Sequence, residues 1–359
     1  MSLSRLIIHQ FRNINSATLD FNSKINVVVG ANGSGKTALL EAIYFLGLGR
    51  SFRTHLTSRV VEHQSKSFTL FSEIQNNNEL IPIGLQKSKS GETLLKINGG
   101  YCKKLANLTQ YLPLQLITPE GYTLLSGSPK NRRAFLDWGV FYHDPIFYPN
   151  WSRIKRLLKQ RNAALKQCKT YNELQIWDNE LCVLSEEISQ QREAYFELLM
   201  PLVKQTLADF LPDFSITSQF FCGWDKSNKS LQNYLFDNFY RDKQIGYTSA
   251  GPQKADLRFK IDGIPVSDVL SRGQLKLFVY ALRLAQGLFL NSFDNKQCVF
   301  LIDDFSSELD QNKQQILAKH IINSDAQIFI SVILPENIDR LFGQEQTVFH
   351  VEHGKITVE

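Results

Sequence analysis

The sequence lacks the cysteine pattern of disulfide-stabilised or zinc-binding proteins. It contains five cysteines, an odd number, and no two of them form a C-x-x-C pair. Scattered single cysteines favour neither a disulfide framework nor a zinc site. We expect them to behave as small buried apolar residues in a reducing compartment. The five are Cys102, Cys168, Cys182, Cys222 and Cys298.

Signals for export or membrane insertion are also missing. Arg5, His9 and Arg12 interrupt the first residues, and no apolar core of a signal peptide follows them. No run approaches the ~20 apolar residues that a membrane-spanning helix needs. The 359 residues, 43% hydrophobic and 21% charged, suit a soluble globular protein with room for two domains. We expect a cytoplasmic protein.

Net positive charge is confined to one segment. The whole chain carries a net +5, whereas residues 130–169 hold ten Lys and Arg residues against Asp137 and Asp144. That segment therefore carries +8, which leaves −3 for the rest of the chain. A basic stretch on a near-neutral chain points to a polyanionic partner, and it describes a solvated helix face equally well.

One stretch fits the phosphate-binding pattern G-x-x-x-x-G-K-[ST]. A β-branched apolar run at 25–29 precedes it and a helix is predicted over 37–46, which gives the strand–loop–helix context that the pattern needs. Backbone N–H groups of the loop and the positive helix end would face one anion. We predict that Lys36 reaches the β- and γ-phosphates of ATP and that Thr37 ligates Mg²⁺. The predicted nucleotide-binding residues here are Gly30, Ala31, Asn32, Gly33, Ser34, Gly35, Lys36 and Thr37.

A second apolar run, Gln297–Ile302, ends in two acids and is predicted to be a buried strand. We predict that Asp303 holds Mg²⁺, directly or through water, because Mg²⁺ prefers hard oxygen ligands. Asp304 is then placed to orient or deprotonate an attacking water and, with Lys36, is a predicted catalytic residue. Such a run is a weak signal alone and becomes specific when a P-loop lies upstream.

Ser271 marks a second helix start that suits an anion. The segment Leu270–Gln274 opens a helix predicted to reach Leu290, with Ser271 as its cap. A single nucleotide needs only one such helix start, so the second would serve a nucleotide held by another copy of the protein. A capped helix start without a ligand explains the same residues and stays open.

Together these motifs resemble those of ABC-type ATPases. The Leu-Ser-Arg-Gly-Gln segment is similar to the signature motif of that family, which implies nucleotide contacts from Ser271, Gly273 and Gln274. Ser307–Asp310 is similar to the D-loop. Arg12, in a Phe-Arg-Asn loop between predicted strands, is similar to an arginine that related heads place near the nucleotide.

Four further stretches resemble the RecF family of bacterial DNA replication and repair proteins, which belongs to the ABC-type and SMC-like ATPases. The stretches are 49–54, 117–121, 127–137 and 249–257. This resemblance covers essentially the whole chain. It implies an ATP-bound head-to-head dimer in which Ser271 of one copy contacts the γ-phosphate that Lys36 of the other copy holds.

The same resemblance implies partners: double-stranded and gapped DNA, the proteins RecR and RecO, and help in loading RecA, all at the nucleoid. It also implies slow ATP hydrolysis, since most ABC-type ATPases have Glu in place of Asp304 and a His near Ser331. Gln253 and Lys254 replace a usual His-Arg pair, which leaves the role of that loop open. Gln115 is a candidate for the Q-loop glutamine.

The predicted fold is α/β, an ABC-type ATPase head built from both chain ends with an inserted α-helical arm. The head is predicted at 1–117 and 246–359, and the arm at 118–245. Residues 1–29 are predicted to form a hairpin that leads into the P-loop strand, and 67–97 a meander. The arm is predicted to be a short antiparallel helical hairpin, unlike the long coiled coil of SMC proteins. An amphipathic helix pair packed on a sheet stays open.

The second arm helix shows a heptad pattern, with apolar residues at alternating steps of three and four. Thr170 and Glu173 precede it with the spacing of a capping box. The predicted seam is Leu174, Trp177, Leu181, Leu184, Ile188, Gln191, Tyr195, Leu198 and Leu202.

Four arginines are predicted to contact DNA. Arg50 and Arg53 lie in a loop just after the P-loop helix. Arg132 and Arg133 lie on a helix that a Ser-Pro pair begins, where structural pairing at the base of the arm explains them equally well.

These observations favour an ATP-gated DNA clamp with weak ATPase activity. Two other functions stay open. The ATPase subunit of a transporter would need surface helices for a membrane partner and, usually, the missing His. A small-molecule P-loop kinase would leave the signature motif and D-loop without a role.

Overall fold

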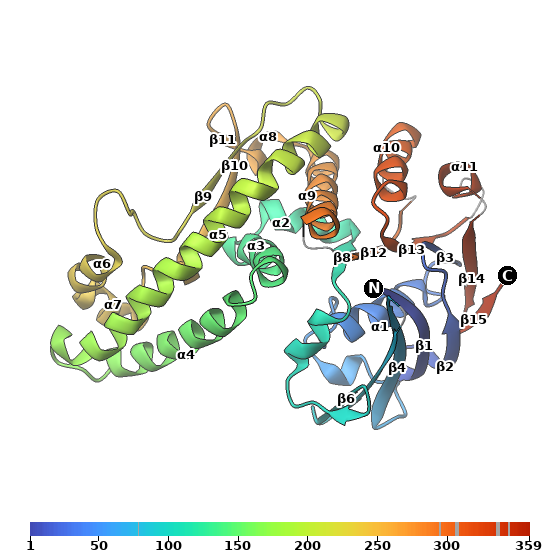
Figure 1. Ribbon diagram of the computed structural model, residues 1–359, viewed down its shortest axis with the longest axis horizontal. Helices are drawn as coiled ribbons and strands as arrows, with labels where there is room; N and C mark the ends of the chain where they lie inside the picture. Colours follow the sequence, from blue (N-terminus) through green and yellow to red (C-terminus); the bar gives the residue numbers. More distant parts are fainter. Residues whose placement is uncertain (78, 294–295, 306–308, 335–337, 344) are drawn as a thin grey trace. The chain divides into compact units, whose positions relative to one another are not determined.

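The computed structural model describes residues 1–77, 79–293, 296–305, 309–334, 338–343 and 345–359. They form two compact units (Figure 1). The head unit comprises Met1–Gly121 and Val279–Glu359, and the arm unit comprises Tyr122–Phe278.

Both ends of the chain build one six-stranded sheet of the head unit. In spatial order its strands are β15 (Lys355–Val358), β14 (Gln346–Glu352), β3 (Ile25–Val29), β13 (Gln327–Val332), β12 (Val299–Ile302) and β8 (Leu114–Ile117). The strands from β14 to β8 are parallel, and β3 pairs with β13 on one side and β14 on the other. The prediction that the two chain ends share a sheet is therefore confirmed. Every residue of β3, β12 and β13 is buried, as expected for strands covered on both faces.

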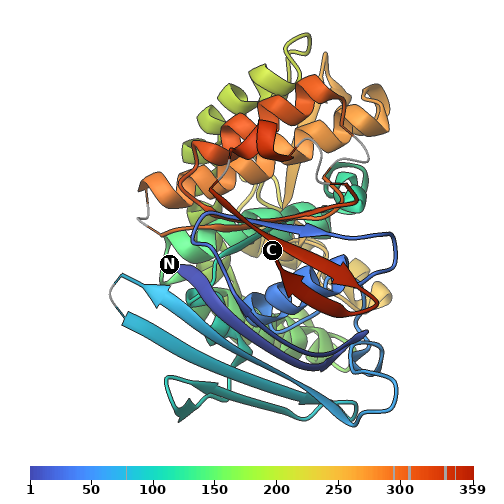
Figure 2. The same cartoon turned by 90° about the vertical axis from the view of Figure 1, so that its right-hand side faces the viewer.

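A second six-stranded sheet of the head unit is antiparallel (Figure 2, dark blue to cyan strands). Its strands, in spatial order, are β2 (Ile14–Asp20), β1 (Ser2–Phe11), β4 (Ser67–Asn76), β5 (Glu79–Ser88), β6 (Thr93–Ile97) and β7 (Gly100–Tyr101). The predicted N-terminal hairpin is β1–β2, and the predicted meander is β4–β5–β6.

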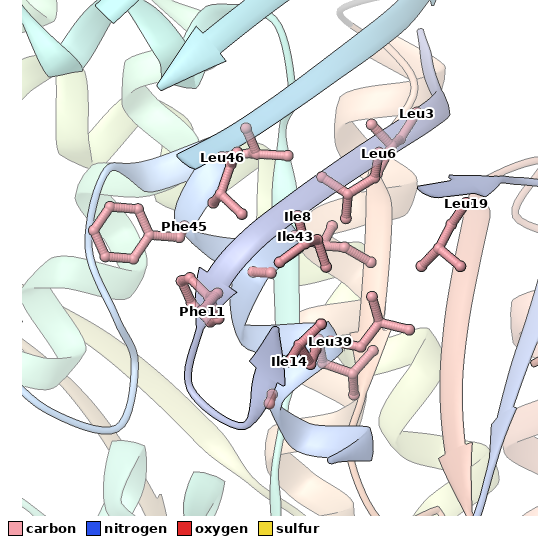
Figure 3. Packing of buried hydrophobic residues seen from close by; sticks show 14 of the residues in the cluster. Leu3, Leu6, Ile8, Phe11, Ile14, Leu19, Leu39, Ile43, Phe45 and Leu46 are labelled. Carbon is pink, nitrogen blue, oxygen red and sulfur yellow. The ribbon is translucent and has the colours of Figure 1, made fainter. Parts of the chain in front are cut away.

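Helix α1 (Lys36–Leu48) is anchored by apolar contacts to both sheets. Figure 3 shows its Ile43 beside Ile8 of β1 and its Leu39 beside Ile14 of β2, all members of one buried cluster. The same buried cluster includes Phe329 of β13. Burying one such side chain stabilises a fold by roughly 1.5–3 kcal/mol, so the cluster holds the start of α1 firmly against the parallel sheet.

Three further helices belong wholly or partly to the head unit. Helix α9 (Arg272–Phe293) begins in the arm unit, and its residues from Val279 onwards belong to the head unit. Helices α10 (Gln311–Ile322) and α11 (Ile338–Phe342) belong to the head. Over the described part of the chain, no helix has both the length and the apolar character that crossing a bilayer requires.

The arm unit contains the predicted helical hairpin. Its long helices are α3 (Pro129–His143), α4 (Phe147–Leu165) and α5 (Gln175–Phe210). A short 3₁₀ turn, η4 (Tyr171–Leu174), joins α4 to α5, which lie side by side (Figure 1). The predicted capping box of Thr170 and Glu173 is present at this turn. The unit also holds the short helices α2 (Thr123–Ser126), α6 (Leu231–Asp237), α7 (Phe239–Ile245) and α8 (Val266–Val269).

A small antiparallel sheet extends the arm unit beyond its predicted end at residue 245, to Phe278. Its strands are β11 (Ile264–Pro265), β10 (Asp256–Ile261) and β9 (Thr217–Phe221). Because β10 pairs with β9, residues 246–278 belong to the arm unit, whereas the sequence placed them in the head. The helices of the arm also contact this sheet, α3 through β10 and α5 through β9.

The predicted heptad seam is correct only in its first part. Leu181, Leu184 and Ile188 are buried, but Leu198 has an exposed fraction of 45%, and Leu199 is fully buried in its place. The buried stripe continues through Val203 rather than Leu202. An α-helix has 3.6 residues per turn, so its buried face drifts away from a strict seven-residue repeat over 36 residues.

A fully buried ion cluster joins α4, α5 and α7. Arg161 donates from Nε and Nη2 to the two oxygens of Asp178, at 2.5 and 3.1 Å. Its Nη1 donates to Thr248 Oγ1 at 2.9 Å and lies 3.7 Å from Asp242. All three charged side chains have an exposed fraction of 0%. Arg161 is thus the shared counterion of two buried carboxylates.

We predict that Arg161→Met lowers the free energy of unfolding of the arm unit by about 3–5 kcal/mol, because it leaves buried carboxylates without their cation. All four tryptophans of the chain lie within the arm unit, so urea unfolding followed by tryptophan fluorescence reports on this unit. Lys159→Met, at an exposed position of α4, is the matched control and should change stability by less than about 0.5 kcal/mol. Equal effects of the two substitutions would contradict the role of the cluster.

Candidate nucleotide-binding site

The predicted phosphate-binding loop is the turn between β3 and α1. Gly35 has a φ of 126°, which side chains other than glycine rarely adopt. The Ser34 carbonyl accepts hydrogen bonds from Asn13 Nδ2 at 3.0 Å and from Gly354 N at 2.8 Å. Gly354 permits this approach, because a Cβ there would lie 1.9 Å from the Asn13 carbonyl oxygen. The β1–β2 and β14–β15 turns therefore brace the loop from the side.

Lys36 is folded onto this loop. Its Nζ donates to the carbonyls of Gly30 at 2.7 Å and Ala31 at 3.0 Å. Burial lowers the pKa of Lys36, while the charges of Asp304 and Asp303 act in the opposite direction. Within the described residues, the buried hydroxyl of Ser34 has no hydrogen-bond partner. A cation, an unsatisfied donor and a helix start thus gather in one loop, which suits a phosphate group.

Thr37 and Asp303 meet across 266 residues of sequence. Asp303 follows β12, and Thr37 Oγ1 donates to its two oxygens at 3.1 and 3.0 Å. Burial raises the pKa of Asp303, while hydrogen bonds from Ser331 and Thr37 act to lower it. The two predicted Mg²⁺ ligands are therefore neighbours, and both offer the hard oxygens that Mg²⁺ prefers.

Ser331 is a site residue that the sequence analysis did not predict. It is fully buried in β13. Its Oγ donates to Asp303 Oδ1 at 2.7 Å and accepts the backbone N–H of Asp304 at 2.8 Å. Asp304 has a φ of 56°, a left-handed conformation that costs about 1–3 kcal/mol where surrounding contacts impose it. Ser331 thus orients both acids, and a polar residue inside a buried apolar strand was the signal for it.

Arg12 lies in the β1–β2 turn beside Asn13, but its guanidinium is bound to a carboxylate. Its Nε and Nη2 donate to the two oxygens of Glu41 on α1, at 2.8 and 2.6 Å. Glu41 has an exposed fraction of 0%. The sequence analysis missed Glu41, since a single acid within a helix predicts no role.

The four predicted DNA-contacting arginines differ in their surroundings. Arg50 is exposed, and the side chain of Arg53 has an exposed fraction of 51%. Arg132 forms two hydrogen bonds to the carboxylate of Asp256, and Arg133 Nη1 donates to the Ala255 carbonyl at 2.7 Å. For Arg132 and Arg133 the structure therefore favours the structural alternative, because these bonds tie α3 to the start of β10.

The predicted signature residues lie in the arm unit at the start of α9. Ser271 and Gln274 form a reciprocal cap: Gln274 N donates to Ser271 Oγ at 3.3 Å, and Ser271 N donates to Gln274 Oε1 at 2.8 Å. Ser271 and Gly273 are exposed. A Cβ added to Gly273 would lie 4.0 Å from its nearest neighbouring atom, so packing within the chain does not explain this glycine. In the predicted D-loop, Ser307 and Glu308 lie outside the described residues.

Two glutamines from the sequence analysis form hydrogen bonds within the chain. Gln115, the candidate Q-loop residue, is fully buried in β8, where its Nε2 donates to Gln286 at 2.9 Å and its Oε1 accepts from Arg283 at 3.0 Å. Gln253 Nε2 donates to the carbonyls of Thr248 and Ala250 within its own loop. These contacts support the fold around them.

Comparison with known proteins gives matches over the full chain. Residues 2–357 match the RecF/RecN/SMC N terminal domain family. The DNA replication and repair protein RecF of Psychromonas ingrahamii (strain DSM 17664 / CCUG 51855 / 37) is 96% identical over 359 residues, 100% of both chains. The protein of the same name from Haemophilus influenzae (strain ATCC 51907 / DSM 11121 / KW20 / Rd) is 49% identical and covers 99% of both chains.

Two solved structures share the fold. The recombination mediator protein RecF with ATP, of the RecFOR pathway, has a TM-score of 0.88 at 24% identity and covers 100% of this chain and 97% of its own. An SMC head bound to the C-terminal winged-helix domain of ScpA has a TM-score of 0.60 at 14% identity, covering 100% and 97%. The predicted fold, an ABC-type ATPase head with an inserted helical arm, is confirmed.

We predict that Asp303→Asn stabilises the nucleotide-free protein at neutral pH. Burial raises the pKa of Asp303 above 3.8, so the folded state holds this proton more tightly than the unfolded chain does. The contribution of Asp303 to stability is thus favourable below pH 3.8 and is lost as pH rises through its raised pKa. The neutral variant should melt about 2–4 °C higher, the shift that ~1 kcal/mol gives a unit of this size.

Thermal melts at pH 7 and near pH 4 check this prediction, since the gain should shrink at the lower pH. Asp20→Asn, an exposed carboxylate on β2, is the control and should leave the melting temperature unchanged. Adding Mg²⁺ and ATP should stabilise wild type more than Asp303→Asn. A variant that melts lower than wild type without nucleotide would show that Asp303 stabilises the head.

Proposed function

Because this chain belongs to the RecF family of DNA replication and repair proteins, we propose that it is an ATP-dependent DNA-binding clamp with slow ATPase activity. The contact between Thr37 Oγ1 and the Asp303 carboxylate, at 3.0 Å, is the observation that carries the proposal. It brings a phosphate-binding loop and an acidic strand end together in one partly buried site. Without this contact the two motifs would be separate patterns in the sequence.

ATP binding uses the residues of the loop. Backbone N–H groups of the loop and the positive end of α1 hold the phosphates, and Lys36 exchanges its two carbonyl partners for phosphate oxygens. Thr37 and Asp303 hold Mg²⁺, which neutralises phosphate charge when bound.

Hydrolysis depends on Asp304, which orients the attacking water or accepts its proton. The side chain of Asp304 is one methylene shorter than the Glu of most ABC-type ATPases, and Ser331 orients it only through the backbone. Most ABC-type ATPases also have a His near the position of Ser331. A serine hydroxyl carries no positive charge and cannot replace the cation that a protonated His supplies. We therefore propose slow turnover, with ATP used as a switch.

Dimerisation completes each site. Ser271, Gly273 and Gln274 of a second copy contact the γ-phosphate, so two nucleotides are held between two heads. The exposure of the α9 start and the unfilled space at Gly273 support this role. A positive helix end that faces an anion lowers the free energy of the ATP-bound dimer relative to separate copies.

DNA and repair proteins are the proposed partners. We propose binding to double-stranded and gapped DNA, and cooperation with RecO and RecR in loading RecA, in the cytoplasm at the nucleoid. The full-length match to proteins named for DNA replication and repair supports these partners over a transporter membrane subunit or a kinase substrate.

Two basic surfaces are candidates for the DNA contacts. One is the loop of Arg50 and Arg53 in the head unit. The other is an open depression of about 550 Å³ on α4, lined among others by Lys155, Lys159 and Lys166. Helix α4 contains no acidic residue, and although its Arg153 pairs with Glu180 of α5, the lysines of the depression give it a positive charge.

Ser271→Arg tests the shared site. We expect it to bind ATP normally, because Lys36 and its loop are unchanged, and to lose ATP-dependent dimerisation, because bulk and charge enter the interface. Lys36→Ala should instead lose ATP binding, since it removes the cation that holds the phosphates. Light scattering with and without ATP, alongside ATP titration calorimetry, separates the two effects. Normal dimers of Ser271→Arg would exclude a nucleotide shared between copies.

Replacing both Arg50 and Arg53 by Ala tests the DNA surface. We expect weaker binding to duplex DNA with ATP affinity retained. The slope of log affinity against log salt should become shallower by ~0.9 for each DNA phosphate that the protein no longer neutralises. Fluorescence anisotropy over a salt series measures this slope, and sequence changes in the DNA should have little effect.

The paired substitution Lys159→Ala/Lys166→Ala is the matched comparison, since it also removes two positive charges. If it reduces the slope while the arginine pair does not, the DNA surface lies on α4. Unchanged slopes in both variants would show that the DNA surface lies neither on the Arg50–Arg53 loop nor on α4.

A further inference from the structure

Glu41 contacts two segments: the β1–β2 turn, which braces the phosphate-binding loop, and the loop that carries Arg50 and Arg53. It lies on α1, four residues after Thr37, and its side chain has an exposed fraction of 0%. A carboxylate this deeply buried is costly unless cations and hydrogen-bond donors surround it. Glu41 has three such partners, from two different loops: Arg12, Ser51 and Arg53.

On one side Glu41 fixes the turn that braces the phosphate-binding loop. Arg12 makes two hydrogen bonds to the Glu41 carboxylate, at 2.8 and 2.6 Å, and has a φ of 56° that few residues adopt. The next residue, Asn13, donates to the carbonyl of Ser34 in the loop at 3.0 Å. The pair Glu41–Arg12 therefore holds Asn13 against the nucleotide site.

On the other side Glu41 fixes the loop that carries Arg50 and Arg53. Ser51 Oγ donates to Glu41 Oε1 at 2.5 Å. The same hydroxyl accepts the backbone N–H groups of Arg53 at 2.9 Å and Thr54 at 3.0 Å. One buried hydroxyl thus builds the turn at 51–54 on the Glu41 carboxylate.

Arg12 and Arg53 both lie near the Glu41 carboxylate, and Arg12 binds it more tightly. Arg12 is bound through two short bonds and has an exposed side-chain fraction of 18%. Arg53 Nη1 lies 3.9 Å from Glu41, and its side chain has an exposed fraction of 51%. A half-exposed cation at this distance is held weakly. A DNA phosphate can therefore withdraw Arg53, and Arg12 then carries more of the neutralisation of Glu41.

We propose that Glu41 is a positioning residue that couples ATP binding at the phosphate loop to DNA binding at the Arg50–Arg53 loop. The proposal rests on the proposed function of the chain. Release of Arg53 to DNA strengthens the Glu41–Arg12 pair and so steadies the turn of Asn13 against Ser34. Because linkage is reciprocal, ATP that orders the phosphate loop must favour DNA binding by the same factor.

The test measures two affinities for each protein. Calorimetry gives the Kd of ATP with and without a saturating duplex, and anisotropy gives the Kd of the labelled duplex with and without saturating ATP. In wild type each ligand should improve the affinity of the other by the same factor, about fivefold or more. In Glu41→Gln both factors should fall to about one, because the neutral amide no longer holds the arginines by charge. Glu92→Gln, an exposed acid of the head unit, should behave as wild type.

Ser51→Ala separates coupling from stability. It leaves the Glu41–Arg12 pair intact and removes the hydroxyl that joins the 51–54 turn to it. We expect the ATP affinity measured without DNA to stay within about twofold of wild type, while the coupling factor falls. This variant decides the question if Glu41→Gln does not fold.

Wild-type coupling in either folded variant would overturn the role of Glu41 and leave the proposed function intact. Failure of the proposed function has a different signature: wild type itself would bind no ATP or no DNA, or Lys36→Ala would bind ATP as wild type does. A loss of coupling in Glu92→Gln would also overturn the proposal, since it would show that coupling responds to the removal of any charge.

Discussion

The pairing of β3 with β13 on one side and with β14 on the other is the constraint on which the head depends. It joins the start of the chain to its last part within one parallel sheet. Parallel strands present their carboxyl ends at the same edge, so the loop after β3 meets the acids after β12, with β13 between them. Ser331, near the end of β13, therefore touches both Asp303 and Asp304.

The charges gathered at this edge oppose folding while they prepare the site. Burial lowers the pKa of Lys36 and raises that of Asp303, so for both groups it disfavours the charged form that nucleotide and Mg²⁺ require. Apolar packing on α1 offsets this penalty, since its Leu39 and Ile43 are fully buried between the sheets. The site is thus held by a core that has no part in its chemistry, and bound ligand removes part of the electrostatic strain.

Sequence analysis succeeded where the signal is local. The P-loop, the acidic end of β12 and the capped start of α9 each occupy a few consecutive residues beside an element with a clear apolar pattern. It failed where a residue acts through a distant partner: Glu41 binds Arg12 29 residues away, and Ser331 binds Asp303 28 residues away. Spacing does not reveal such contacts, and although a serine in the apolar strand β13 hints at a role, it does not identify the partner. The arm boundary was missed for the same reason, because β10 pairs with a strand that precedes it by more than 30 residues.

Charge counting could not separate the two kinds of basic residue in segment 130–169. In the structure Arg132 pairs with the mostly buried Asp256 and Arg161 with the fully buried Asp178, and both acids lie outside that segment. Their charge is neutralised locally and contributes little to a long-range field. Lys159 and Lys166, by contrast, line an open surface. The +8 of the segment therefore overstates what a polyanion would meet on α4, and any attraction to DNA there depends on its exposed basic residues, such as Arg156, Lys159 and Lys166, rather than on the total count.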